Sequence, residues 1–410
     1  MTKVFIAFFL CLNLFSFGQT PEGKKELFTI KSEVYKADRK IAIYLPPNYE
    51  DVKDEKLPLI FVFDGQWEQL FNYITSSVSY LSDIGVMRKY IIIGIYTEDR
   101  RKEFIPEPVT AELIKKFKAK GEFGYSNLLD KHIKEEVLPF IESKFKVENY
   151  RLAIGHSLGG TYIMNSFAQN KNLFNSFIAF SPNLEYDSGQ IVKRINALLF
   201  SKKSINSFVN ISVGDKDLTE QSFKIGIKQL DSIFKTTKVN GLKIRFDYLK
   251  NETHQSSPYK ELPSALTEFA NLTGKPSDEE LLKMLKSNKS SFSNELKIKY
   301  KSISEFVGYN YTPTEREVNT MAYFSFNNKN YKEAIKVADW GLELYPKALN
   351  IFDSKAEFLD AEKDYATSLE VLQKGQIKLE EIKSELAEDF YIYYKKMLED
   401  HIIKTKKNGR

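Results

Sequence analysis

The sequence predicts a doubly wound α/β domain followed by a smaller, all-helical domain. Up to about residue 271, short apolar stretches alternate with amphipathic ones, and from residue 312 onward the pattern is helical throughout. Several short stretches, such as 58–63 and 91–93, are apolar without interruption. Unbroken apolar runs are typical of strands covered on both faces, as in a parallel sheet. Their alternation with helices indicates an α/β fold.

The first segment is predicted to be a targeting sequence. The apolar run Val4–Phe17 is short for crossing a bilayer. Ser16 and Gly18 provide the small residues that precede a signal-peptidase cleavage site. We therefore expect residues 1–18 to be a signal peptide and the mature protein to be periplasmic or secreted, with an uncleaved anchor as the alternative. The single cysteine, Cys11, lies in this run, so the mature chain would hold no disulfide, thiolate metal site or cysteine nucleophile.

The α/β domain is expected to cover residues 19–274. Its predicted strands are 27–34, 41–44, 57–63, 90–96, 151–154, 176–180, 208–213 and 242–249. Its predicted helices are 68–81, 128–145, 161–169, 222–234 and 263–272. The first two strands are joined by only four residues, so they are expected to form an antiparallel hairpin at the sheet edge.

The composition changes after residue 274. Ser277 to Glu280 has the spacing of a capping box, which starts a helix. We expect residues 275–311 to form a helical linker, loosely packed over the Lys-, Ser- and Asn-rich stretch 283–304.

Residues 312–410 carry an internal repeat. Ala322, Tyr331 and Gly341 recur as Ala356, Tyr365 and Gly375, at the period of about 34 residues typical of tetratricopeptide repeats. Small residues are needed where two helix backbones approach closely. The region is predicted to be a tetratricopeptide-like helical domain, which serves either as packing or as a docking module for a protein partner.

The charge balance excludes one class of partner. The chain has 60 basic and 55 acidic residues and a net charge of +5. Nucleic-acid binding usually needs a clustered basic surface, which this balance does not indicate. No segment after the first is long and apolar enough to span a membrane.

The chemistry is predicted to centre on the pentapeptide Gly155-His156-Ser157-Leu158-Gly159. It lies between an expected strand and an expected helix, as the Gly-x-Ser-x-Gly nucleophile elbow requires. In that turn the serine hydroxyl projects above the sheet, and side chains at the glycine positions would strike the neighbouring strand and helix. An ordinary glycine-rich turn with a capping serine is the alternative, and the strand-turn-helix context favours the nucleophile.

A serine hydroxyl needs a base to become a good nucleophile. The chain has four histidines. His132 precedes the elbow, His156 lies inside it and His401 lies in the helical tail. His254 is therefore the predicted base, because it lies in the loop after the last expected strand.

Three carboxylates, Asp215, Asp217 and Glu220, follow the expected strand 208–213. We choose Asp217 as the residue that orients the imidazole, because it lies just beyond Gly214, which lets the loop turn back toward the sheet. Glu220 is not excluded. Nucleophile, acid and base then occur in the chain order expected of an α/β hydrolase.

Acyl transfer also needs hydrogen-bond donors for the developing oxyanion. The backbone amide of Leu158 is one candidate, and the amide of Gly65 or Gln66 is the other. Four side chains are candidates for substrate contact: Arg100, Trp67, Phe104 and His156. An arginine here could bind an acidic or catecholate group, whereas a structural pair with Glu103 is the alternative. For the aromatic residues, core packing is the alternative.

Further motifs accompany the elbow, which extends to Gly160. They are Tyr44–Tyr49, Phe63–Gln66, the pattern Arg100-x-x-Glu103-Phe104-x-Pro106, and Glu136–Ile141. With these motifs, residues 27–272 resemble the putative esterase family, the group of esterase D, enterochelin esterase and the mycolyltransferases. The resemblance implies a serine triad with Asp or Glu as its acid and without metal or organic cofactor. The family's substrates include siderophore lactones, feruloyl or acetyl esters of sugars, S-formylglutathione and trehalose mycolates. The helical tail is not part of the resemblance.

The sequence as a whole therefore predicts an exported serine esterase acting on a small, siderophore-linked or carbohydrate-linked ester. An acyltransferase that uses the same site is one alternative. A non-catalytic scaffold that binds a partner through its helical repeats is the other.

Overall fold

The structure is a computed structural model that describes residues 22–53, 55–120, 124–169, 172–287 and 289–409. The predicted signal peptide, with Cys11 and the cleavage site after Gly18, lies outside the described residues.

The core is an eight-stranded sheet in the order β1-β2-β4-β3-β5-β6-β7-β8. The strands are β1 (Lys24–Ser32), β2 (Ala37–Leu45), β3 (Leu57–Phe63), β4 (Ile91–Ile95), β5 (Val147–His156), β6 (Ser176–Phe180), β7 (Ser204–Val213) and β8 (Asn240–Tyr248). β1 and β2 form the predicted antiparallel hairpin, and β2 also pairs antiparallel with β4. All other pairs are parallel. The predicted doubly wound α/β fold is confirmed.

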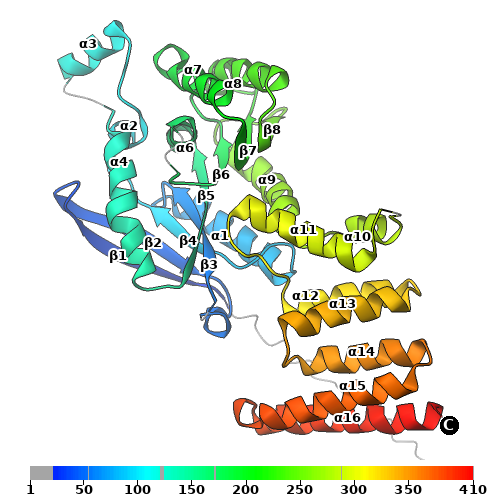
Figure 1. Ribbon diagram of the computed structural model, residues 1–410. Coiled ribbons are helices and arrows are strands. Elements are labelled where there is room, and N and C mark those ends of the chain that lie inside the picture. The colour runs from blue at the N-terminus through cyan, green and yellow to red at the C-terminus, as the bar shows by residue number, and fades with distance from the viewer. Residues whose placement is uncertain (1–21, 54, 121–123, 170–171, 288, 410) are drawn as a thin grey trace, which may run out of the picture.

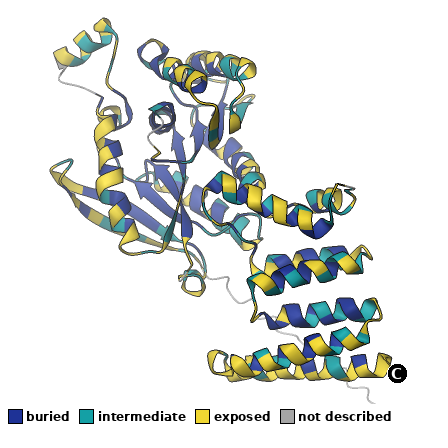
Figure 2. Ribbon diagram, in the orientation of Figure 1, coloured by how far each residue is buried: buried dark blue, intermediate teal, exposed yellow. Residues whose placement is uncertain are grey.

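Two layers of helices cover the sheet (Figure 1). One layer contains α1 (Glu68–Asp83) and α9 (Ser257–Thr273), and the other contains α6 (Leu158–Gln169), α7 (Tyr186–Ser201) and α8 (Leu218–Thr236). Alternate residues of a strand point to opposite faces. Accordingly Phe61 and Phe63 of β3 join the core beneath α6, whereas Ile60 and Val62 join the core beneath α1 and α9. Figure 2 shows the central strands β3, β4 and β6 buried between the layers.

Shorter elements surround the sheet. They are η1 (Tyr49–Asp51), α2 (Arg100–Phe104), α3 (Ala111–Lys120), α4 (Ser126–His132), the π-helical turn η2 (Ile133–Val137) and α5 (Leu138–Glu142). The last three together form the predicted helix 128–145. Helix α7 is not among the predicted helices. Its first turn contains Asp187, Ser188 and Gly189, which are residue types typical of turns. All three adopt left-handed conformations, so the sequence does not show where this helix begins.

The segment predicted as a loosely packed linker contains two helices, α10 (Asp278–Leu285) and α11 (Phe292–Val307). Helix α11 is tightly packed, because one of its faces is fully buried. That face carries Phe292, Leu296, Tyr300, Ile303 and Val307, spaced three or four residues apart as on one side of a helix. The Lys, Ser and Asn residues that suggested loose packing occupy mainly the other faces.

The remaining helices are α12 (Glu315–Asn327), α13 (Tyr331–Leu344), α14 (Leu349–Ala361), α15 (Tyr365–Glu381) and α16 (Glu388–Asn408), with the short turn η3 (Lys383–Glu385) before the last. In Figure 1 they lie below α10 and α11, from α12 and α13 down to α16. A side chain at Gly341 would come within 2.9 Å of side-chain atoms of Val318 and Ile351. Gly341, one of the recurring small residues, therefore lies where helices cross. Within the described ranges, no helix is long and apolar enough to cross a membrane.

Candidate active site

Ser157 lies in a strained turn between β5 and α6. Its φ is 57°, a left-handed value that is uncommon for a residue with a side chain. A Cβ at Gly155 would lie 2.5 Å from the backbone of Gly159, so only glycine fits there. The Ser157 amide donates to the carbonyl of Phe180 at 2.9 Å, which ties the turn to β6. This is the geometry that the nucleophile elbow requires.

The imidazole of His254 is held by a buried carboxylate. Its Nδ1 lies 2.5 Å from Oε1 of Glu220, whose side chain is fully buried. The other oxygen of Glu220 accepts from the hydroxyl of Ser181 at 2.9 Å and from the amide of Gly214. A carboxylate on Nδ1 fixes the tautomer in which Nδ1 carries the proton and Nε2 is free to accept one.

Glu220, not Asp217, contacts the imidazole. Asp217 caps α8 and accepts a hydrogen bond from the amide of Glu220 at 3.0 Å. It also accepts from the backbone amide of His254 at 2.7 Å, and this bond is the main reason that the pKa of Asp217 is lowered. The expectation that Asp217 orients the ring is therefore wrong for this structure. Asp217 positions the loop that carries the ring, and the residue three positions later reaches the ring itself.

His156 joins the elbow to the His254 loop. It is 2% exposed, and its Nε2 donates to the carbonyl of His254 at 2.8 Å. The two imidazole rings lie 4.6 Å apart. Burial, reinforced by His254, lowers the pKa of His156 to about 3, so its ring stays neutral. His254 is thus held against the elbow, although the Ser157 hydroxyl makes no hydrogen bond within the described part of the chain.

Two of the three predicted oxyanion donors are available. The amide of Gly65 donates to the carbonyl of Ile95 at 2.9 Å, so it is not free for a substrate. The amide of Gln66 makes no hydrogen bond to the described residues, and the side chain of Gln66 is held by Thr97 at 2.9 Å. Leu158 is the first residue of α6, and the first amides of a helix have no partner within it.

Arg100 is committed to a buried carboxylate. Its Nε and Nη2 donate to the two oxygens of Asp64 at 2.8 and 2.9 Å, and its guanidinium lies 4.6 Å from the ring centre of Trp67. Asp64 is 1% exposed, and burial raises its pKa. The alternative pair with Glu103 does not form, because Glu103 pairs with Arg39. Arg100 therefore braces the loop that carries Gln66 and has little charge left for an acidic substrate.

Phe104 belongs to the core beneath the site. Its ring is fully buried and packs against Phe63 and Tyr162, with ring centres 5.9 and 5.8 Å away. The expectation that it binds substrate is wrong, and core packing is the correct reading. Trp67, by contrast, is half-buried and lines a cavity beside the elbow, together with His156.

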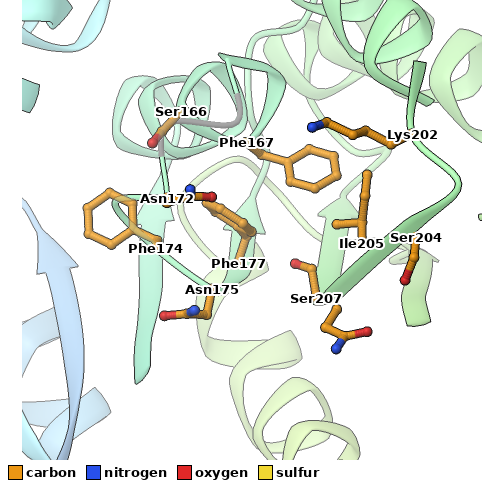
Figure 3. A pocket seen from close by; sticks show the side chains of 11 residues that line it. Ser166, Phe167, Asn172, Phe174, Asn175, Phe177, Lys202, Ser204, Ile205 and Ser207 are labelled. Atoms are coloured by element: carbon orange, nitrogen blue, oxygen red, sulfur yellow. The ribbon is translucent and has the colours of Figure 1, made fainter. Parts of the chain in front are cut away.

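A different cavity, shown in Figure 3, has a volume of about 320 Å³. It lies where β6 and β7 begin and is lined by residues such as Phe177 and Ser207. Because β5, β6 and β7 are parallel, this edge of the sheet is opposite to the one that bears Ser157. The cavity is therefore separate from the candidate active site. In the described ranges, His, Cys, Asp and Glu form no group of three or more that could hold a metal ion.

The chain is similar to a known family and to a curated relative. Residues 32–222 match the family described as "Putative esterase". A stretch of 100 residues is 27% identical to the ferri-bacillibactin esterase BesA of Bacillus subtilis (strain 168) and spans only 35% of that relative and 24% of this chain.

Two solved structures share the fold. An IroE-like serine hydrolase from Shewanella oneidensis has a TM-score of 0.62 at 19% identity, with 78% of this chain and 100% of that chain covered. An uncharacterised protein from Capnocytophaga ochracea DSM 7271 has a TM-score of 0.67 at 18% identity, with 86% and 93% covered.

Proposed function

We propose that the protein is a serine carboxylic-ester hydrolase of the putative esterase family, and the match of residues 32–222 to the model of that family supports this proposal. Ser157 attacks the ester carbonyl while Nε2 of His254 takes its proton. His254 returns the proton to the leaving alcohol, and water then releases the acid from the acyl-enzyme by the reverse proton transfers.

The observation that carries this proposal is the Glu220–His254 pair, whose loop is joined by His156 to the elbow that holds Ser157 in a left-handed conformation. Glu220 stabilises the imidazolium that forms when His254 accepts the proton. The amides of Leu158 and Gln66 are the donors proposed for the oxyanion. The missing hydrogen bond between Ser157 and His254 is compatible with this role, because catalytic hydrogen bonds in free enzymes are often long and tighten in the substrate complex.

We also propose a substrate class, a location and a role for the helical region. BesA is named for ferri-bacillibactin, so we propose a small ester, siderophore-linked or carbohydrate-linked esters included. Export is supported by the apolar run 4–17 and the small residues after it. The recurrence of Ala322, Tyr331 and Gly341 supports a tetratricopeptide-like assignment for the helical region and a protein partner for it.

The proposal is tested with Ser157→Ala. We expect its kcat on p-nitrophenyl acetate to fall by about 10³-fold or more, because the nucleophile is lost while the base and oxyanion donors remain. A fluorophosphonate probe should label the wild type and fail to label the variant. Ser302→Ala, which alters an exposed serine on α11, is the matched control and should keep full activity and labelling. A Ser157→Ala protein that is labelled and active like the wild type would exclude the mechanism.

A further inference from the structure

We propose that the cavity between the first turns of α1 and α9 binds an uncharged aromatic ring of the ester substrate. The inference rests on the proposed esterase function and adds a chemical class of substrate to it. The cavity has a volume of about 330 Å³, close to the lower limit of about 300 Å³ for ligand pockets. It is therefore suited to one ring rather than to a whole large ligand.

The cavity lies beside the reacting groups. Three of its lining residues are direct chain neighbours of the proposed catalytic residues. Trp67 follows the oxyanion donor Gln66, His156 precedes Ser157, and Gln255 follows His254. Because the segments that carry the nucleophile, the base and one oxyanion donor each contribute a wall residue, a group in the cavity would lie close to the ester bond.

The walls carry no formal charge. Among the residues that the structure describes, no Lys, Arg, Asp or Glu lines the cavity. The pKa of His156 is lowered to about 3, mainly by burial, so this wall is neutral as well. Gln69 and Gln255 provide uncharged amides. A charged substituent would lose its hydration here without gaining a partner, which disfavours an ionised ring.

The remaining walls form a fixed aromatic surface. The rings of Tyr73 on α1 and Tyr259 on α9 lie 5.6 Å apart at an interplanar angle of 32°. The Tyr73 hydroxyl donates to the carbonyl of Tyr259 at 3.0 Å, which holds the pair in place. Tyr259 is nevertheless 70% exposed. The exposed ring of Tyr259, held in one orientation in the same cavity as Trp67 and Leu70, is suited to stack on a ligand ring.

Matched esters test this directly. Benzyl acetate and cyclohexylmethyl acetate form the first pair, in which only the aromaticity of the ring on the alcohol side differs. Methyl phenylacetate and methyl cyclohexylacetate form the second pair, in which only the aromaticity of the ring on the acyl side differs. The wild type should prefer the aryl member of one pair, and that pair identifies the half of the ester that occupies the cavity. Tyr259→Ala should lower the aryl-to-cyclohexyl ratio of kcat/KM by roughly 3- to 10-fold, mostly through KM, because aromatic pairing is lost in addition to apolar contact.

Two variants and one substrate serve as controls. Tyr259→Phe should retain the preference, because the ring remains. Tyr80→Ala removes a tyrosine that is 64% exposed on α1 but does not line the cavity, so its ratio should equal that of the wild type. A 4-carboxylate on the preferred aryl ester should raise KM.

The outcomes separate this inference from the proposed function. If the wild type hydrolyses these esters but Tyr259→Ala leaves the ratio unchanged, the aromatic site is wrong and the esterase stands. If the wild type hydrolyses no ester and fluorophosphonate does not label it, the proposed function fails first.

Discussion

At the scale of single residues, the two carboxylates at the start of α8 have different tasks. Glu220 contacts the ring of His254, whereas Asp217 contacts only backbone amides. Glu220→Gln should lower kcat on p-nitrophenyl acetate by about 10³-fold or more, because an amide permits the wrong imidazole tautomer and cannot stabilise imidazolium. Asp217→Asn keeps a hydrogen-bond acceptor at position 217 and leaves the contact between Glu220 and the imidazole in place. Its kcat should therefore fall much less. Circular dichroism checks that both variants fold, and a reversed order of losses would return the role to Asp217.

The same pair shows how far the sequence predicts the site. Ser157 and His254 follow from a motif and from chain order, because few arrangements satisfy both. Asp217 and Glu220 are three residues apart, and which one reaches the ring depends on where α8 begins. The helix begins at Leu218, so Asp217 becomes its cap and Glu220 is turned inward. An Asp directly before a helix is a typical N-cap, and this could have indicated that Asp217 serves as a cap.

Other misassigned side chains fail for a related reason. Spacing places Phe104 and Arg100 near the site but does not show what surrounds them. Phe104 fills the space beside Phe63, and Arg100 finds the buried Asp64. The amide of Gly65, in the loop after β3, donates to the carbonyl of Ile95 at the end of β4, and sequence alone does not reveal this contact. Backbone donors and buried partners are set by tertiary packing, which is why these assignments required the structure.

At the scale of elements, the elbow and the hairpin are predictable because each is local, whereas α7 and α11 are not. The elbow needs only Gly155, Gly159 and the strand and helix beside them. Helix α11 is hidden by its polar composition, although its apolar residues recur at helical spacing. Periodicity is therefore the better guide where composition and periodicity disagree.

One helix contact in the tail is expected to depend on pH. His401 on α16 lies 2.6 Å from Oδ1 of Asp353 and 3.4 Å from Oδ2 of Asp360, both on α14. Burial opposes the charged ring, but the hydrogen bond and charge of Asp353, aided by Asp360, outweigh it and raise the pKa of His401 above 6.5. The protonated ring therefore stabilises the fold fully below pH 6.5, and this contribution is lost as the pH rises through the raised pKa.

His401→Gln tests this contact. In urea unfolding followed by helical circular dichroism, the difference in unfolding free energy between wild type and variant should be largest near pH 6 and shrink toward about pH 9. Both Asp353 and Asp360 remain in the variant, so the comparison isolates the titration of the imidazole. A difference that is constant over this range would show that the ring acts through packing alone.

At the scale of the whole molecule, one hydrophobic core joins the sheet to the helical region. It runs from Ile60 of β3 through Phe269 of α9 and Ile303 of α11 to Val318 of α12 and Ile351 of α14. Arg88, in the loop after α1, reinforces this connection, because it donates to the carbonyl of Thr312 and lies over the ring of Tyr311. The helical region thus packs on apolar surface of the α/β domain and is not joined to it by a flexible linker alone.

A shared core implies that the two regions lose their structure together. Ile303 is 1% exposed on α11, and Ile303→Ala should lower the free energy of unfolding by about 2–5 kcal/mol, because it removes buried methyl groups and leaves a cavity. Ile298→Ala on the same helix is the control, since Ile298 is 52% exposed and should change stability by less than about 0.5 kcal/mol. In urea, esterase activity and helical circular dichroism should disappear at one midpoint, shifted equally in Ile303→Ala. Two separated transitions, with activity unaffected by Ile303→Ala, would instead mean that α11 belongs to an independent tail and that the α/β domain is stable without it.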